Sequence, residues 1–160
     1  MAKDKYPVTP AIRFLRAQKI EPLDFCVYEY EEKGGARQAA EFLQEDLHRV
    51  IKTIVFQDEQ KQGLIALMHG DGEVSSRNLA RLAGRKHLEP ANQNQASKWT
   101  GYRFGGTSPF GLKTALPIFA QESILDLDYF WINGGKQGFQ IRLQPQNLHI
   151  LSPQFVNIIA

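Results

Sequence analysis

The sequence contains a single cysteine, Cys26, so no disulfide can form within its 160 residues. A lone thiol is typical of proteins from a reducing compartment. The first ten residues, MAKDKYPVTP, lack a continuous apolar segment, and we therefore expect no secretory signal peptide. No stretch approaches the roughly 18 apolar residues that a transmembrane helix needs. These absences predict a soluble, cytoplasmic protein that does not associate with membranes.

The sequence also lacks a large excess of charge, because its 19 Lys and Arg residues and 17 Asp and Glu residues give a net charge of +2. This balance permits nucleic-acid binding without arguing for it. The four histidines lack HxH or HExxH spacing, which predicts that the chain holds no metal. No Gly-Lys-Ser/Thr ends the glycine-rich region, so nucleoside triphosphate binding is not expected. We expect neither a metal nor a cofactor.

Apolar spacing and turn residues divide the chain into interspersed helices and strands. Helices are expected over residues 10–21, 36–48, 75–82 and 89–98, and from 145 onward. Strands are expected over residues 25–30, 50–57, 64–70, 129–133 and 139–143, the second and third forming a hairpin. The order lacks a clean βαβ rhythm. We therefore expect a single mixed α/β domain, residues 1–160, around one central sheet.

One lysine interrupts an apolar strand. Lys52 shares a strand face with Val50, Ile54 and Phe56, because side chains alternate along a strand. A lysine in this position must reach solvent, pair with a carboxylate or face a cavity. Two interpretations stay open: an edge-strand lysine that prevents aggregation, or a cation at a pocket wall that meets a phosphate, a carboxylate or an ester oxygen.

Two glycine-rich segments could bring backbone groups to a ligand. Residues 105–111 read GGTSPFG, and residues 133–136 read NGGK. Glycine lets backbone N–H groups approach a ligand, and successive N–H groups can hold an anion or polarise a carbonyl. The structural alternatives are a compact surface loop for the first segment and a hairpin turn for the second.

A row of arginines is the strongest basic feature. Arg77, Arg81 and Arg85 are four residues apart and would share a helix face, and Lys98 precedes Trp99. Cations beside an aromatic ring suit RNA phosphates and a stacked base. A solvated helix face is the commoner explanation of such a row.

Taken in order, four segments resemble the YbaK-type aminoacyl-tRNA deacylases and the related editing domain of bacterial prolyl-tRNA synthetases. They are the strand lysine in VIKT, the block TGYRFGGTSPFG, Leu116-Pro117, and NGGKQG before a strand. The resemblance covers nearly the whole chain. It implies a mixed, largely antiparallel sheet flanked by helices, and hydrolysis in trans of the ester that joins a wrong amino acid to tRNA, without a metal. It also implies aminoacyl-tRNA and prolyl-tRNA synthetase as partners.

The resemblance also assigns site residues. The implied catalytic residues are Lys52, Gly105 and Gly106. The implied substrate-binding residues are Tyr30, Thr53, Thr107, Ser108, Pro109, Asn133, Gly134, Gly135 and Gln140. The tRNA-binding residues that we expect come from the basic row rather than from the resemblance, and they are Arg77, Arg81, Arg85 and Lys98. On this interpretation the N–H of Gly106 and its neighbours polarise the ester carbonyl or orient the ribose, Lys52 holds the tRNA terminus, and water or a substrate group attacks.

Two positions differ from the cysteine-editing relatives. Those relatives look to have serine where this chain has Asn133, and aspartate where it has Gln140. Cysteine, alanine and serine therefore stay open as the amino acid removed, with tRNA-Pro as the expected carrier. The alternative function is a catalytically silent module of the same fold that binds tRNA or a synthetase. A third, weaker alternative is hydrolysis of another small activated ester.

Overall fold

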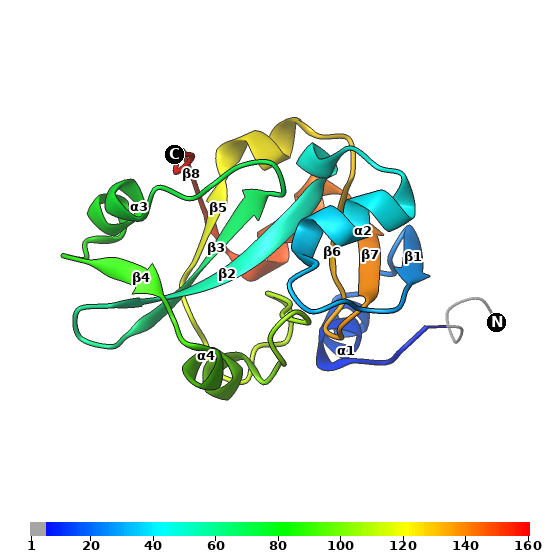
Figure 1. Ribbon diagram of the computed structural model, residues 1–160, viewed down its shortest axis with the longest axis horizontal. Coiled ribbons are helices and arrows are strands. Elements are labelled where there is room, and N and C mark those ends of the chain that lie inside the picture. The colour runs from blue at the N-terminus through cyan, green and yellow to red at the C-terminus, as the bar shows by residue number, and fades with distance from the viewer. Residues whose placement is uncertain (1–5) are drawn as a thin grey trace.

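The computed structural model describes residues 6–160; residues 1–5, on which the signal-peptide expectation partly rests, lie outside the described residues. One eight-stranded sheet has the order β1-β7-β6-β2-β3-β5-β8, and β4 pairs with β2 off this path (Figure 1). The strands are β1 (Asp24–Val27), β2 (Val50–Asp58), β3 (Gly63–His69), β4 (Leu88–Pro90), β5 (Ile118–Gln121), β6 (Phe130–Asn133), β7 (Phe139–Leu143) and β8 (Gln154–Val156).

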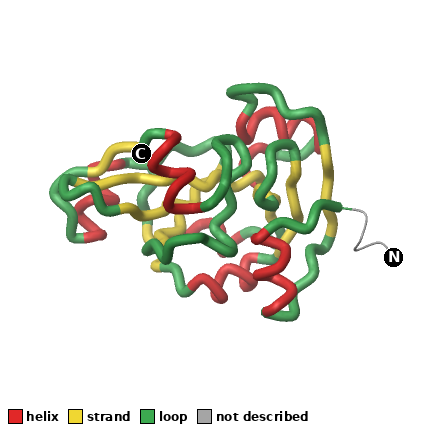
Figure 2. The backbone as a smooth tube through the Cα atoms, turned by 90° about the horizontal axis from the view of Figure 1, so that it is seen from below, coloured by secondary structure: helices red, strands yellow, loops and turns green. Residues whose placement is uncertain are grey.

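The pairing within this sheet is mixed. The pairs β1–β7, β2–β3, β2–β4 and β6–β7 are antiparallel, whereas β2–β6, β3–β5 and β5–β8 are parallel. The turned view in Figure 2 shows helices on both sides of the sheet. The expected mixed α/β fold with a mixed, largely antiparallel sheet flanked by helices is therefore confirmed.

Local capping chemistry sets the helix ends. The four α-helices are α1 (Pro10–Ala17), α2 (Gly35–Leu43), α3 (Ser76–Ala83) and α4 (Gln93–Thr100). Short 3₁₀ helices are η2 (Leu47–Arg49), η3 (Glu122–Asp126) and η4 (Pro145–Leu151). The side chains of Thr9, Ser75 and Asn92 accept hydrogen bonds from the first turns of α1, α3 and α4. No described helix is long and apolar enough to cross a membrane.

Both faces of the sheet are covered by apolar clusters. The largest cluster includes Ile51 and Val55 of β2, α1, and Phe110 of the loop that follows α4. On the opposite face, α2 packs over Val50 and Trp131, and α3 packs beside Phe56. Lys52 and Ile54 lie between these two covers, on the same face of β2 as Val50 and Phe56.

The register of β2 leaves an opening in the sheet. Along one side, β3 pairs with β2 from Ile51 to Gln57. Along the other side, β6 pairs only with Val50 and Ile51, and β4 pairs only from Phe56 to Asp58. No described strand pairs with residues 52–54 on that side. A gap beside Lys52 therefore separates β6 from β4, within an otherwise continuous sheet.

Some boundaries differ from expectation. The strand expected over 25–30 ends at Val27, and the helix expected over 36–48 divides into α2 and η2. Glu89 and Pro90, expected to begin a helix, belong to β4, and α4 begins three residues after Pro90. Proline suits this position because an edge strand need not donate every N–H. Strands β5 and β8 were not expected, because short strands buried by parallel neighbours show no alternation.

Gly138 and Gly84 form a matched pair for testing a close backbone approach. Both have positive φ, +75° and +71°. A Cβ at Gly138 would lie 2.1 Å from the carbonyl oxygen of Tyr28, whereas nothing lies within 4 Å of a Cβ at Gly84. We expect Gly84→Ala to lower the free energy of unfolding by about 1–2 kcal/mol, the cost of left-handed backbone alone.

Gly138→Ala should cost clearly more than its control, because β1 must also move away from β7. Urea titration of both variants gives the two free energies of unfolding. Equal costs would contradict the close approach.

Candidate functional site

A cavity of about 440 Å³ occupies the gap beside β2. Its wall combines apolar side chains of β2 with Ala36 of α2 and Ala96 of α4. Seven of the residues expected at the site line it: Tyr30, Lys52, Thr53, Gly105, Thr107, Asn133 and Gln140. The open strand edge explains why Lys52 and Thr53, which point to opposite faces of the sheet, both reach one cavity.

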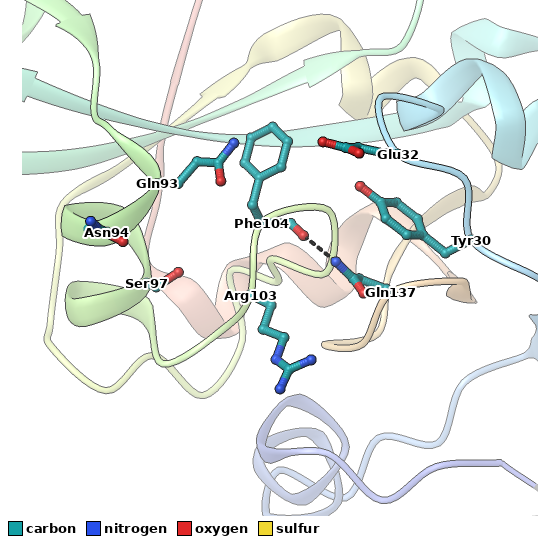
Figure 3. Close-up of a pocket in the computed structure, with 8 residues that line it drawn as sticks. All are labelled: Tyr30, Glu32, Gln93, Asn94, Ser97, Arg103, Phe104 and Gln137. Atoms are coloured by element: carbon teal, nitrogen blue, oxygen red, sulfur yellow. Dashed lines mark hydrogen bonds between the residues drawn. The ribbon is translucent and has the colours of Figure 1, made fainter.

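Side-chain amides clamp the first glycine segment to the second. Asn133 Nδ2 donates to the carbonyl oxygen of Gly105 at 3.2 Å. Gln137 Nε2 donates to the carbonyl oxygen of Phe104 at 2.8 Å (Figure 3). A Cβ at Gly105, where φ is +85°, would lie 2.3 Å from Tyr30 Oη. The glycine is therefore required for Tyr30 to approach the loop.

This clamp determines which backbone donors are available. The N–H of Gly106 donates to the carbonyl of Arg103 at 2.9 Å, so the structure does not support the expected use of this group on substrate. The N–H groups of Gly105 and Thr107 have no acceptor among residues 6–160, and both residues line the cavity. In a trans peptide the C=O and N–H point in opposite directions. Because Gln137 holds the Phe104 carbonyl, the Gly105 N–H points away from the 133–138 turn.

The second glycine segment is a turn that supports the clamp. Asn133 Oδ1 accepts from the N–H groups of Gly135 and Lys136 at 2.7 and 3.0 Å. The Gly134 N–H donates to the Phe139 carbonyl, and a Cβ at Gly134 would lie 2.5 Å from the Phe139 ring. These donors are occupied and neither glycine lines the cavity, so the hairpin-turn alternative describes this segment.

Ser108 and Pro109 do not reach the cavity either. Both are buried, and Ser108 Oγ accepts from the Phe110 N–H at 3.1 Å. They lie behind the loop and shape its backbone, together with buried Gly106. The structure therefore separates the expected substrate-binding residues into a lining set and a supporting set.

Lys52 is held at the wall of the cavity. Its Nζ donates to the carbonyl of Gly72 at 2.6 Å and lies 3.6 Å from a carboxylate oxygen of Glu73. The side chain is 22% exposed. Strand β2 lies between β6 and β3, so Lys52 is not on an outer edge of the sheet; it lies at the local opening between β6 and β4 and lines the cavity there. The ammonium group is positioned rather than freely solvated.

Two buried polar atoms in this wall lack a partner. Thr53 Oγ1 and Gln140 Oε1 make no hydrogen bond within residues 6–160, although both residues line the cavity. Leaving such an atom unsatisfied costs about 1–3 kcal/mol. Burial raises the pKa of Tyr28, and a hydrogen bond with Gln140 partly opposes this shift, so the phenol stays neutral at pH 7. The unpartnered atoms are suited to pair with a polar ligand.

The described lining contains no histidine, cysteine, aspartate or glutamate. Cys26 lies on β1 away from the cavity, and burial raises the pKa of its thiol to about 11. The lining therefore offers positioned donors and two cations, Lys33 and Lys52, with no activated side-chain nucleophile among the residues described.

The expected arginine row is only partly correct. Arg77 and Arg81 are exposed on α3 and border a separate hollow of about 460 Å³. Arg85 follows the end of α3 and pairs with the buried carboxylate of Asp58. Burial by itself would raise the pKa of Asp58, but hydrogen bonds from Gln62 and Arg85 outweigh it and lower the pKa.

Lys98, the fourth basic residue expected to bind tRNA, is exposed on α4. It borders a third shallow hollow with residues 92–95 and does not line the 440 Å³ cavity.

Several lining residues were missed by sequence reasoning. Phe104, Tyr28 and Lys33 line the cavity, and Gln137 holds the loop in place. Phe104 lies within the quoted glycine block, so its position could have been noticed. Gln137 likewise lies within the quoted segment NGGKQG. Tyr28 and Lys33 follow β1 in a segment without a distinctive pattern, and the pairing of β1 with β7 brings that segment to the cavity.

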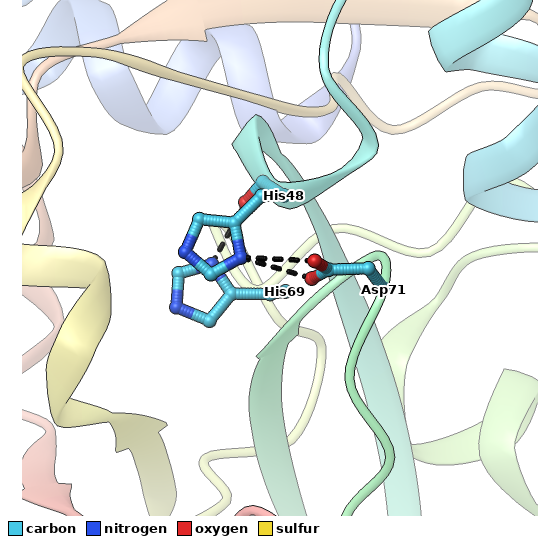
Figure 4. A group of neighbouring side chains, drawn as sticks. All are labelled: His48, His69 and Asp71. Carbon is cyan, nitrogen blue, oxygen red and sulfur yellow. Dashed lines mark hydrogen bonds and ion pairs between the residues drawn. The ribbon is translucent and has the colours of Figure 1, made fainter.

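A second cluster joins His48, His69 and Asp71, whose possible ligand atoms lie within 4.8 Å of one another (Figure 4). The imidazole rings are stacked, with centroids 3.7 Å apart and planes 5° from parallel. A metal bound by imidazole lies in the ring plane, so stacked rings cannot direct their lone pairs to one ion. His69 already contacts the His48 carbonyl and Ser123 Oγ, both at 2.7 Å. The arrangement is a hydrogen-bond network.

This network predicts a pH dependence of stability. Burial lowers the pKa of His69, and the hydrogen bond to the His48 carbonyl only partly opposes it. Above the unfolded-state value of about 6.5 the ring is neutral in both states and its contribution is complete. As the pH falls below 6.5 the unfolded chain binds the proton first, so stability decreases until the pH reaches the folded-state pKa.

Urea titrations between pH 8 and 5 measure this decrease. His69→Gln should reduce it, and His87→Gln, at an exposed site, should leave it unchanged. An unaltered pH profile in His69→Gln would contradict the assignment.

Comparisons with known proteins agree with this arrangement. Residues 31–150 match the family model described as the aminoacyl-tRNA editing domain. A protein of Enterococcus faecalis, provisionally named Cys-tRNA(Pro)/Cys-tRNA(Cys) deacylase EbsC, is 29% identical over 160 residues, with 99% of this chain and 98% of that protein covered. Proline–tRNA ligase of Maridesulfovibrio salexigens is 32% identical over 106 residues, which are 66% of this chain and 18% of the ligase.

A solved structure shares the fold. It is described as a provisionally assigned trans-editing enzyme for prolyl-tRNA synthetase, and it matches with a TM-score of 0.83 and 23% identity. The match covers 96% of this chain and 99% of that one.

Proposed function

The chain belongs to the family of aminoacyl-tRNA editing domains, and from this premise we propose that it hydrolyses, in trans, the ester between a small, wrongly attached amino acid and tRNA. The single observation that carries the proposal is one cavity lined both by residues with unoccupied backbone N–H groups, Gly105 and Thr107, and by residues with unpartnered side-chain oxygens, Thr53 and Gln140. The names of the relatives support tRNA-Pro as carrier and prolyl-tRNA synthetase as partner, with action in the cytoplasm.

The loop supplies electrostatic stabilisation. The N–H groups of Gly105 and Thr107 are the donors available for the ester carbonyl oxygen as it gains negative charge. Water attacks the carbonyl carbon, the bond to the ribose oxygen breaks, and that oxygen takes a proton, which releases the amino acid and the tRNA hydroxyl. One such donor typically contributes about 100- to 1,000-fold in rate. An aminoacyl ester is already activated, so this chemistry does not require a side-chain nucleophile.

The wall supplies recognition. Gln140 Oε1 can accept a hydrogen bond from the α-ammonium group, and Thr53 Oγ1 can bond a neighbouring oxygen. Lys52 places a positive charge at the ribose or ester oxygen. Small side chains on α2 and α4 limit the space available to the amino acid. Clash rejects large side chains, whereas one methylene changes binding by only about 1–3 kcal/mol.

The direct test is a panel of charged tRNAs. Purified protein is incubated with tRNA-Pro carrying cysteine, alanine, serine or proline, with and without prolyl-tRNA synthetase, and the ester remaining is measured over time. We expect loss of at least one small amino acid, with Pro-tRNA-Pro spared. A thiolactone product from the cysteinyl ester would identify the substrate thiol as nucleophile. Stable binding without loss of any ester would contradict hydrolysis and favour a silent binding module.

Lys52→Met tests the ammonium group while retaining most of the apolar stem. We expect kcat/KM to fall by about 100-fold or more, as for loss of one transition-state donor. Lys61→Met, at the tip of the β2–β3 hairpin, is the matched control and should retain activity. Urea titration of Lys52→Met shows whether the contact with Gly72 is needed for folding. A folded Lys52→Met variant with full activity would remove this lysine from the mechanism.

The basic residues of α3 make separable predictions. Replacing Arg77 and Arg81 together with alanine should weaken tRNA binding and reduce the slope of log Kd against log salt by roughly 1.5, because two phosphate contacts are lost. Arg85→Ala should leave that slope unchanged. It should instead lower the free energy of unfolding by about 1.5–3 kcal/mol, because Asp58 loses a charged hydrogen bond. Salt titrations and urea titrations measure the two effects, and an unchanged slope in the double variant would exclude this surface.

A further inference from the structure

One aromatic side chain of the glycine loop is exposed at the rim of the site. Phe104 is 52% exposed, although it neighbours buried Gly106 and lines the 440 Å³ cavity. Its carbonyl is held by Gln137, and the next residue is fixed by Asn133. The backbone that presents the ring is therefore anchored. The exposed ring is therefore held in a fixed position, in which its face can contact a ligand.

The ring also borders a second hollow of about 550 Å³, which shares Tyr30 with the first. The rest of this hollow is almost entirely polar and is lined by Glu32, Gln93, Asn94, Ser97, Arg103 and Gln137. In Figure 3 the Gln93 amide lies on one side of the Phe104 ring, and Glu32 and Tyr30 lie on the other. Arg103 points away from the ring.

The exposed ring and the polar groups around it together indicate which class of ligand the hollow can bind. A flat apolar face surrounded by amide and carboxylate groups suits a planar ligand with a polar edge. Nucleobases stack on aromatic side chains and offer donors and acceptors around the ring. Gln93 carries both a donor and an acceptor, the pair that reads N6 and N7 of adenine. An aliphatic ligand would leave these polar groups without partners.

Resting on the proposed function, we propose that Phe104 stacks on the terminal adenine of the tRNA while the acyl ester occupies the adjoining cavity. The two hollows meet at Tyr30 and Phe104, so one ligand can fill both. The base then anchors the ribose beside the Gly105 and Thr107 N–H groups. Gln93 and Glu32 contact the edge of the base.

Fluorescence of uncharged tRNA-Pro with 2-aminopurine as its 3′-terminal base tests the stacking without requiring hydrolysis. We expect binding to quench the fluorophore, because stacking on an aromatic ring does so. Phe104→Leu, which keeps an apolar side chain but loses the flat face, should raise Kd by about 5- to 150-fold and remove the quenching. Phe104→Trp should restore both. The same fluorophore at an internal acceptor-stem position should not respond to Phe104→Leu.

Kinetics with charged tRNA separates this inference from the proposed function. If Phe104→Leu hydrolyses the ester with unchanged KM and unchanged quenching, the stacking inference is wrong and the deacylase function stands. If Phe104→Leu changes the preference among amino acids with tRNA affinity unaltered, the ring is a wall of the amino-acid pocket and the inference is again wrong. Quenching that depends on Phe104 without hydrolysis of any charged tRNA would support stacking and overturn the function. Failure of wild-type protein to bind the labelled tRNA would overturn both.

Discussion

The clamp between two loops, made by the amides of Asn133 and Gln137, is the interaction on which the site depends. Each amide holds one carbonyl of the glycine loop, at Gly105 and Phe104. Because a trans peptide directs its C=O and N–H oppositely, holding a carbonyl also directs the donor on its other side. The clamp therefore orients the Gly105 N–H and the Phe104 ring together. The Asn133 amide is held in place to bind the Gly105 carbonyl because its Oδ1 accepts hydrogen bonds from the N–H groups of Gly135 and Lys136, in the turn that Asn133 begins.

The second constraint is the interrupted pairing along β2. A strand that exchanges one partner for another along the same side must leave an opening between them, and the opening here coincides with Lys52 and Thr53. The opening lets side chains from opposite faces of the sheet reach one ligand. It also coincides with a buried polar atom, Thr53 Oγ1, that has no hydrogen-bond partner among residues 6–160. The strand pairing therefore determines where the site lies, and the residue types at the opening determine its chemistry.

The sequence predicted those elements whose signals are local. The β2–β3 hairpin and the capped helices α1 and α3 follow from spacing and composition. The strand lysine and the glycine block were singled out by the same local patterns, and both contribute residues to one cavity. The sequence could not predict which glycine of the block lines the cavity and which one is held in a turn. Gly105 lines the cavity while Gly106 is occupied by a turn, and this difference depends on amides about 30 residues away. Arg85 shows the same limit, since its helical spacing indicated a surface row and Asp58 determined its position.

A site built from the main chain separates catalysis from specificity. The proposed oxyanion donors belong to the backbone, so substitutions at neighbouring side chains leave them in place as long as the clamp survives. In the proposed function, Gln140 and Thr53 act through side-chain atoms, so their substitution can change the preferred amino acid without altering the loop. Asn133 belongs to the clamp rather than to the recognition surface, because both ends of its amide are occupied by backbone groups. We therefore expect substitutions at Asn133 to change loop geometry, and substitutions at Gln140 to change the amino acid removed in the proposed function.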